Sequence, residues 1–106
     1  MGIFDVFKKK NIDQWVEEYK ATSGAILLDV RTVQEYQQGH IPGSKNIPVQ
    51  QIDEVASVVN DKNTPLYVYC RSGARSGRAA STLKNMGYVN AVNIGGILSY
   101  VGKVER

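Results

Sequence analysis

The sequence predicts an α/β fold, with a central, mostly parallel sheet of about five strands and helices on both faces. Short apolar runs alternate with amphipathic stretches, which is typical of a parallel sheet whose strands are connected by helices. The strand-like runs are apolar almost throughout, as expected for strands buried on both faces. The chain has 106 residues and no repeat or linker, so we expect one domain spanning 1–106.

The first helix is expected to start at Asp13, as its N-terminal cap, and to run to about Lys20. Ile12, just before it, is predicted to lie in a short edge strand or a turn. One face of this helix is apolar, which predicts that it packs on the sheet. The residues of that face are Trp15, Val16 and Tyr19.

The next predicted strand is Ala25–Val30, a nearly continuous apolar run with a charged residue near its end. Thr32 is followed three residues later by Glu35, and this pair forms a capping box. The capping box predicts a short helix over Val33–Gln37, which Gly39 is expected to end.

A turn, a brief strand and a helix are predicted in the middle of the chain. Proline and glycine fix the backbone of a turn over His40–Ser44, and Asn46-Ile47 can form a strand that Pro48 ends. A helix is predicted over 50–59, because apolar residues recur there with the spacing of one buried helix face. These residues are Ile52, Val55, Ala56 and Val59.

The second half of the chain contains the expected central strand, Leu66–Tyr69, and the longest helix. That helix is predicted over Ser76–Met86 with Gly87 as its C-terminal cap. The last strand is Ala91–Ile94, after which Gly95-Gly96 is expected to turn the chain into a short terminal helix. The inward residues of the long helix are Ala79, Ala80, Leu83 and Met86.

Composition and charge narrow the class of protein. Apolar residues make up 42% and charged residues 22%, and no apolar run approaches a membrane span, so we expect a soluble protein without a membrane partner. The net charge of +3 comes from scattered basic residues, so we expect no nucleic-acid partner. One cysteine and one histidine are too few for a zinc cluster, so neither a metal nor an internal disulfide is expected.

The first ten residues carry no expected secretory signal. The basic run Lys8-Lys9-Lys10 follows a very short apolar stretch, whereas a signal has the reverse order and a longer apolar region. The run is interpreted as solvated surface. Gly2 would suit myristoylation, but Val6 stands where that motif requires serine or threonine. We therefore expect a cytoplasmic protein.

The single cysteine, Cys70, ends an apolar run and opens a glycine-containing loop before a predicted helix. A strand that leads into such a turn directs backbone N–H groups and the positive helix end at the side chain. Arg71 and Arg75 add positive charge, which favours the nucleophilic thiolate and suits a small anion. An isolated cysteine is more often a small buried apolar residue, and this alternative is disfavoured here by the loop around it.

Asp29 lies near the end of a predicted strand, as Cys70 does, and Arg31 lies just beyond. Ligands of open α/β sheets bind outside the carboxyl ends of the strands. We therefore expect these three residues to lie near one rim of the sheet.

Several short segments, taken together, resemble the rhodanese family of sulfurtransferases. They occur in the family's order over about two thirds of the chain, and the Gly-His-Ile-Pro-Gly segment upstream of a Cys-x-x-Gly-x-Arg-Ser loop is specific. The matching segments are Asp29-Val30-Arg31, Glu35-Tyr36, Gly39–Ser44, Asn46-Ile47-Pro48, the loop that starts at Cys70, and Gly95-Gly96-Ile97.

The resemblance implies a thiosulfate sulfurtransferase. In it, Cys70 takes sulfane sulfur from a small anionic donor such as thiosulfate, becomes a persulfide and passes the sulfur to a thiol or a protein acceptor. Loop amides would hold the negative charge of the terminal sulfur without a metal or an organic cofactor. The hydroxyls of Ser72 and Ser76 can donate to a bound anion or cap the helix. The residues expected to bind substrate are Arg71, Ser72, Gly73, Ala74, Arg75 and Ser76.

Three alternatives share this fold. One is a persulfide carrier or interaction module with little thiosulfate turnover, and another is an inactive regulatory domain, which the presence of Cys70 disfavours. The third is a cysteine phosphatase or arsenate reductase. Phosphatases of the cell-cycle dual-specificity group have one residue more between cysteine and arginine, so that the loop fits phosphate. Here four residues separate Cys70 from Arg75, which favours sulfur.

Residues outside the loop are expected to support it rather than to react. Asp29 and Arg31 can orient the loop or contact substrate, but Arg31 and Glu35 can also pair with each other across the start of a helix. His40 lies in a turn that is structural in the family, so it is not expected to act as a base. Tyr100 stands where the family often has tryptophan, and is interpreted as a core or rim substitution.

Overall fold

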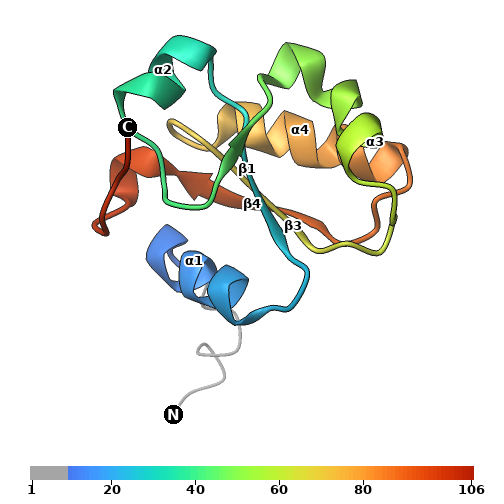
Figure 1. Ribbon diagram of the computed structural model, residues 1–106, viewed down its shortest axis with the longest axis horizontal. Helices are drawn as coiled ribbons and strands as arrows, with labels where there is room; N and C mark the ends of the chain where they lie inside the picture. Colours follow the sequence, from blue (N-terminus) through green and yellow to red (C-terminus); the bar gives the residue numbers. More distant parts are fainter. Residues whose placement is uncertain (1–9) are drawn as a thin grey trace.

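Four parallel strands form the sheet of this computed structural model, which describes residues 10–106 (Figure 1). Their order across the sheet is β2-β1-β3-β4, and each neighbouring pair is parallel. The predicted α/β class is confirmed, with four strands in the described part of the chain instead of about five. The strands are β1 (Ile26–Asp29), β2 (Lys45–Asn46), β3 (Leu66–Cys70) and β4 (Ala91–Gly96).

The short edge strand or turn predicted at Ile12 is not found, because Ile12 is the first residue of helix α1 (Ile12–Ala21). The helix is capped by Asn11 and not by Asp13. The Asn11 side chain accepts a hydrogen bond from the Gln14 N–H at 2.9 Å, and the Gln14 side chain accepts one from the Asn11 N–H at 2.9 Å. This capping box uses both side chains, so it satisfies two N–H groups that a helix start leaves unpaired.

Helices cover both faces of the sheet, as predicted. Helix α1 lies against one face, while η2, α3 and α4 lie against the other (Figure 1). Successive strand residues point to opposite faces, so the strands contribute to both layers of the core. On the α1 face the buried cluster includes Ile12, Val16, Leu27, Tyr67, Tyr69 and Ile94. On the other face it includes Leu28, Val30, Val55, Leu66, Val68, Cys70, Ala79 and Leu83.

The helix predicted over 50–59 is instead two short elements, the 3₁₀ helix η2 (Val49–Glu54) and α3 (Val55–Val58). Ile52 is buried as predicted, whereas Ala56 is exposed. Val49, Ile52 and Val55 are spaced by three residues, which is the period of a 3₁₀ helix. The prediction assumed the α-helical period throughout.

The other predicted elements are present with shifted ends. The capping box of Thr32 and Glu35 starts helix α2 (Val33–Gln38), and Gly39 is its C-terminal cap. Helix α4 (Ala74–Asn85) begins two residues earlier than predicted and is capped by Met86, with Gly87 following. The short terminal helix is η3 (Ile97–Ser99), a single 3₁₀ turn.

The predictions made for residues 1–9, including those on Gly2 and Val6, lie outside the described residues. Lys10 is described, and it is not simply solvated. Its ammonium group forms an ion pair with Glu18 and lies 4.4 Å from the centroid of the Trp15 ring. Within residues 10–106, no helix has the length and apolar character needed to cross a membrane.

Candidate active site

Cys70 is the last residue of β3, so its side chain lies at the carboxyl edge of the sheet. It pairs across the sheet with Gly96, the last residue of β4, and Asp29 ends the neighbouring strand β1. The structure therefore brings Asp29 and Cys70 to one rim, as predicted. The cysteine is only 1% exposed, so its sulfur depends on the protein for hydrogen bonds.

The sulfur accepts hydrogen bonds from the loop that follows it. The Gly73 N–H donates to the Cys70 Sγ at 3.0 Å, and the Ser76 hydroxyl lies within donating distance at 3.3 Å. Burial raises the pKa of Cys70, but the hydrogen bond from the Ser76 hydroxyl and those from the N–H groups of Ser76, Gly73 and Ser72 outweigh it. The pKa therefore lies below that of an ordinary thiol. Such a thiol is ionised more readily, and the thiolate is the nucleophilic form.

The loop can direct these N–H groups inward because Gly73 adopts a left-handed conformation, with φ at 107°. Gly73 is the N-terminal cap of α4, and no side chain caps this helix. The first N–H groups of an uncapped helix are free to donate elsewhere. Here the Ser76 N–H, which belongs to the first turn of α4, is among the donors to the sulfur.

Arg75 and Glu35 form an ion pair between α4 and α2. The guanidinium nitrogens of Arg75 lie 2.7 and 3.0 Å from the two carboxylate oxygens of Glu35. The hydrogen bond from Arg75 is the main cause that lowers the pKa of Glu35 to about 2. The alternative in which Glu35 pairs with Arg31 is not realised, because the two residues pair with Arg75 and Asp29 instead. Glu35 serves the capping box at the start of α2, and from there its carboxylate faces Arg75.

Arg31 pairs instead with Asp29 in a buried ion pair. Its Nε lies 3.0 Å from both carboxylate oxygens, and its Nη2 lies 2.7 Å from Oδ2. The same Nη2 donates to the Gly39 carbonyl oxygen at 2.8 Å, and the backbone N–H of Arg31 donates to Asp29 at 2.9 Å. These bonds connect the end of β1 to the end of α2. The geometry fits the supporting role expected for both residues.

Arg71 differs from the other two arginines because its side chain is exposed and forms no ion pair with any of residues 10–106. It lines a hollow of about 290 Å³ beside the loop, which we call the rim hollow. Glu35 and Arg31 border this hollow on one side, and Leu98 and Val104 provide an apolar border. Of the three arginines near the rim, Arg71 is thus the one whose charge is available to an anion.

Asn93 is a site residue that the sequence did not reveal. Its Oδ1 lies 2.7 Å from the Ser76 hydroxyl, and its Nδ2 donates to the Gly73 carbonyl oxygen at 3.1 Å. The only signal in the sequence was its position near the end of a predicted strand, two residues before the double glycine. Its partners, Ser76 in α4 and Gly73 at the cap of α4, are 17 and 20 positions away in the chain, so spacing alone could not identify it.

Gly96 brings the end of β4 against the loop. A Cβ atom at this position would lie 2.2 Å from the Arg71 carbonyl oxygen and 2.5 Å from the Ser72 Cα. No larger residue fits there without moving the loop. The Leu98 N–H donates to the same Arg71 carbonyl oxygen at 3.1 Å, which fixes the start of the loop from the other side.

The remaining predicted residues have structural surroundings. The His40 Nδ1 lies 2.9 Å from the Tyr36 carbonyl oxygen, and the His40 ring stacks on Tyr36 at 3.7 Å. Tyr100 is partly buried against the cluster on the α1 face. Ser72 is exposed on the loop, and Ala74, the first residue of α4, is exposed as well.

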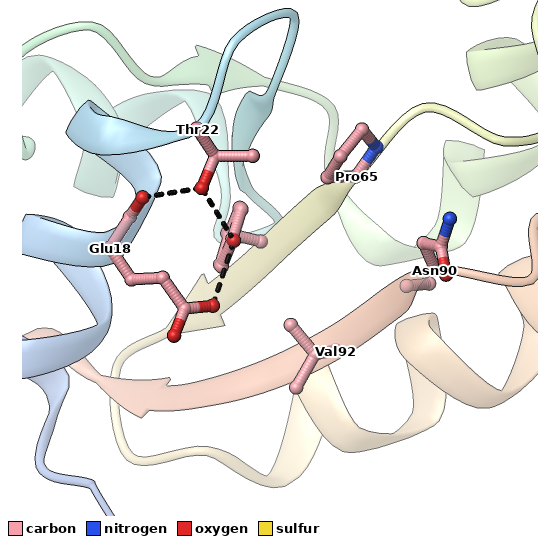
Figure 2. A pocket seen from close by; sticks show the side chains of 7 residues that line it. Glu18, Thr22, Pro65, Asn90 and Val92 are labelled. Atoms are coloured by element: carbon pink, nitrogen blue, oxygen red, sulfur yellow. Dashed lines mark hydrogen bonds between the residues drawn. The ribbon is translucent and has the colours of Figure 1, made fainter.

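A second hollow of about 330 Å³ lies at the amino end of β3 and β4 (Figure 2). Glu18, Thr22 and Tyr67 line it and bond to one another. The Tyr67 hydroxyl donates to Glu18 at 2.9 Å and lies 3.3 Å from the Thr22 hydroxyl, which donates to the Glu18 carbonyl oxygen at 2.6 Å. We call it the amino-end hollow.

Comparison with known proteins identifies the family. The model of the rhodanese-like domain matches residues 12–103. The chain is 44% identical over 71 residues to "Thiosulfate sulfurtransferase PspE" of Escherichia coli strain K12, covering 66% of this chain and 68% of that protein. It is 39% identical over 80 residues to "Putative sulfur carrier protein YrkF" of Bacillus subtilis strain 168, covering 74% of this chain but only 43% of that protein.

Among solved structures, the fold is similar to that of a "rhodanese with anions from E. coli". The TM-score is 0.73 with 36% sequence identity, and the match covers 77% of this chain and 98% of that one. The parallel sheet and the loop at its carboxyl edge thus occur in a chain whose sequence matches one family over most of its length. This protein is a member of the rhodanese-like domain family.

Proposed function

We propose that this protein is a sulfurtransferase in which Cys70 carries the sulfur as a persulfide. The observation that supports this proposal most directly is the convergence of the Gly73 N–H and the Ser76 hydroxyl on a buried sulfur. These donors favour the thiolate, and they remain available to the charge on a persulfide. The relatives named for sulfur transfer and sulfur carriage support the same chemistry.

The transfer proceeds in two displacement steps. The Cys70 thiolate attacks the outer sulfur of thiosulfate, the S–S bond of thiosulfate breaks, and sulfite leaves with the electron pair. The product is a persulfide anion on Cys70. An acceptor thiolate or cyanide then attacks the outer sulfur, and the Cys70 thiolate leaves. No net oxidant or reductant is needed, because each step exchanges one nucleophile for another at sulfur.

The three arginines at the rim have different roles in this proposal. Arg71 attracts the anionic donor, because its charge is exposed and unpaired within residues 10–106. Arg75 supports the loop through its ion pair with Glu35, which offsets most of its charge. Arg31 is buried with Asp29 and supports the end of β1. This division refines the expectation that Arg71 and Arg75 serve alike.

Mass spectrometry after incubation with thiosulfate tests the proposal. The protein should gain the mass of one sulfur atom, and a reducing thiol should remove it. Cys70→Ser is the matched control, because it replaces only the sulfur atom, and it should gain nothing. An unchanged mass of the wild-type protein, or an equal gain in Cys70→Ser, would contradict the assignment.

A second measurement separates an enzyme from a carrier. Continuous turnover of thiosulfate with cyanide as acceptor indicates an enzyme, whereas stoichiometric loading with negligible turnover indicates a persulfide carrier. The similarity to a protein named as a sulfur carrier is the observation that favours this second candidate. Aryl phosphate hydrolysis that requires Cys70 and exceeds sulfur transfer would favour a phosphatase instead.

A further inference from the structure

The Ser76 hydroxyl has one hydrogen and more than one acceptor within reach. The Asn93 Oδ1 is the nearest at 2.7 Å, and the Cys70 Sγ lies at 3.3 Å. The Gly73 and Gly95 carbonyl oxygens lie at 3.2 and 3.4 Å. A hydroxyl donates to one acceptor at a time, so Asn93 and the sulfur compete for the same hydrogen.

The orientation of the Asn93 amide follows from its backbone contacts. The Gly95 N–H donates to Oδ1 at 3.0 Å, and Nδ2 donates to the Gly73 carbonyl oxygen at 3.1 Å. A flipped amide would place a donor against a donor and an acceptor against an acceptor. The oxygen of Asn93 therefore faces Ser76, and its nitrogen holds the loop at Gly73.

Three features of β4 and α4 place Asn93 in this position. Ala91 and Asn93 point to the same face of the sheet, because side chains alternate along a strand, and α4 covers that face. The register then shifts, since Val68 pairs with Asn93 but Tyr69 pairs with Gly95. On α4, Gly77 leaves room for the amide, because a Cβ atom there would lie 3.3 Å from the Asn93 Nδ2.

We propose that Asn93 is a positioning residue that holds the Ser76 hydroxyl and the Gly73 peptide against the Cys70 sulfur, so that both stabilise its thiolate. This inference rests on the proposed function of Cys70 as the nucleophile. While the thiol is neutral, the Ser76 hydroxyl donates to Asn93 and stays in place. When the thiol ionises, the charged sulfur becomes the stronger acceptor, and the hydrogen turns to it without movement of Ser76.

The charged groups near the Cys70 sulfur lie on other elements than Asn93. Arg71 and Arg75 come from the loop and from α4, and Asp29 ends β1. Arg31 and Glu35 pair with Asp29 and Arg75 respectively. A change at Asn93 leaves all five of these groups in place. The variants below therefore test the hydrogen bonds of Asn93 and not the arginines.

The test is the pH dependence of alkylation of Cys70 by iodoacetamide in Asn93→Asp. The new carboxylate would lie within about 6 Å of the sulfur, accept the Ser76 hydrogen more strongly and lose the bond to the Gly73 carbonyl. All three changes disfavour the thiolate. We expect the midpoint of alkylation to move to higher pH and the rate at neutral pH to fall about three- to thirtyfold. The limiting rate at high pH should stay close to that of the wild type.

Asn90→Asp is the matched control. It makes the same substitution next to the opposite end of β4, where Asn90 donates to the Asn63 carbonyl oxygen at 2.9 Å. Its alkylation midpoint should equal that of the wild type, even if its stability falls as much as that of Asn93→Asp. The readout thus separates positioning of the donors from a general loss of stability.

A double-mutant cycle tests whether Asn93 acts through Ser76. Ser76→Ala and Asn93→Ala should each raise the midpoint, and the effect of Asn93→Ala should shrink when Ser76 is already alanine. Fully additive effects would contradict action through Ser76. Midpoints in Asn93→Asp and Asn93→Ala that equal those of the wild type and Asn90→Asp would overturn the inference.

Alkylation needs no sulfur donor, so the two proposals fail separately. A wild-type protein that takes no sulfur from thiosulfate, while the Asn93 variants still shift the midpoint, would contradict only the proposed function. Normal sulfur loading in the wild type with an unmoved midpoint in the Asn93 variants would contradict only the role of Asn93.

Discussion

The two ends of the sheet both carry hollows lined by polar groups, but their polar groups are arranged differently. At the amino end, Glu18, Thr22 and Tyr67 bond to one another (Figure 2). Lys10 forms an ion pair with Glu18. At the carboxyl end, donors from the loop and from α4 converge on one acceptor, the Cys70 sulfur. The amino-end groups satisfy one another, whereas the donors at the carboxyl end share one acceptor, the Cys70 sulfur.

The volumes of the two hollows do not distinguish the candidate active site from the other end of the sheet. The amino-end hollow, at about 330 Å³, is slightly larger than the rim hollow, at about 290 Å³. What distinguishes the carboxyl end is chemistry. It combines a buried thiol whose pKa is lowered by hydrogen bonds with an exposed arginine, Arg71, that has no ion pair within residues 10–106. Burial, which raises that pKa, is outweighed there by the loop donors.

The largest effect on the carboxyl end is expected from Gly96→Ala. The added methyl group would lie 2.2 Å from the Arg71 carbonyl oxygen, so the loop must move away from β4. We expect a loss of about 3 kcal/mol in the free energy of unfolding and a sulfur transfer rate at least a hundredfold lower. Urea unfolding and the thiosulfate assay measure the two quantities.

Gly87→Ala is the control for that substitution, because it also replaces a glycine by alanine, but at a positive φ of 102°, whereas the φ of Gly96 is −127°. A Cβ atom at Gly87 would contact only the Lys62 side chain, at 3.7 Å, far from the loop in the chain. Gly87→Ala should lower stability and leave the activity of the folded protein unchanged. Equal losses of activity in both variants would mean that close approach at Gly96 is not what matters.

Replacing Arg71 and Arg75 one at a time tests whether the two arginines have the different roles proposed for them. Arg71→Ala should reduce kcat/KM for thiosulfate about tenfold and change stability by less than about 0.5 kcal/mol. Arg75→Ala should instead lower the free energy of unfolding by about 1 kcal/mol, because it leaves Glu35 without its ion-pair partner. Steady-state kinetics at two salt concentrations and urea unfolding make the comparison. If Arg75→Ala lowered kcat/KM and Arg71→Ala lowered stability, the roles proposed for the two arginines would be wrong.

Acid should weaken the carboxyl end through Glu35. Its pKa is lowered from 4.5 to about 2 in the folded protein, mainly by Arg75, so the carboxylate stabilises the fold above about pH 4.5. This stabilisation is lost as the pH falls from about 4.5 to 2. The difference in unfolding free energy between wild type and Glu35→Gln should be about 1 kcal/mol at pH 7, since the pair is partly exposed. It should shrink toward pH 2.

Glu17→Gln is the control for the acid experiment, because the Glu17 carboxylate is 74% exposed and, among residues 10–106, pairs only with Lys20, at 3.3 Å. Its unfolding free energy should follow that of the wild type closely between pH 7 and pH 3. If Glu35→Gln also follows the wild type, the ion pair with Arg75 contributes no measurable stability.

The smallest effect on the Cys70 site is expected from Tyr67→Phe, a substitution at the amino end of the sheet. The substitution removes the hydroxyl that bonds to Glu18 and lies near Thr22. We expect a loss of about 1 kcal/mol in stability and no change in the pH midpoint of Cys70 alkylation. A shifted midpoint in a folded Tyr67→Phe protein would show that the two ends of the sheet are coupled.

Local sequence signals predicted much of the fold. The capping box of Thr32 and Glu35 located the start of α2, because all of its bonds form within four residues. The start of α1 was misplaced, since Asn11 and Asp13 are both good caps and only the fold selects between them. The 3₁₀ helix η2 was missed because its apolar residues fit two helical periods over a short stretch.

Contacts between distant segments could not be predicted in this way. Glu35 and Arg75 are 40 positions apart, and the adjacent possibility, Arg31, was the only partner that spacing offered. Asn93 reaches Ser76 from another element, 17 positions along the chain. The position of Cys70 at the end of a strand was predictable, but which groups surround its sulfur depends on how β4 and α4 pack.

The place of β4 at the outer edge of the sheet bears on the dynamics of the site. Among the described strands, β4 pairs only with β3, so it can separate without disturbing the pairing of β1 and β2. Asn93 and Gly96 leave the loop when it does. Segments of a folded protein open locally with free energies that range from near zero up to that of global unfolding. Each such opening withdraws the Asn93 contact from the loop, and amide hydrogen exchange in β4 reports how often the thiolate loses this support.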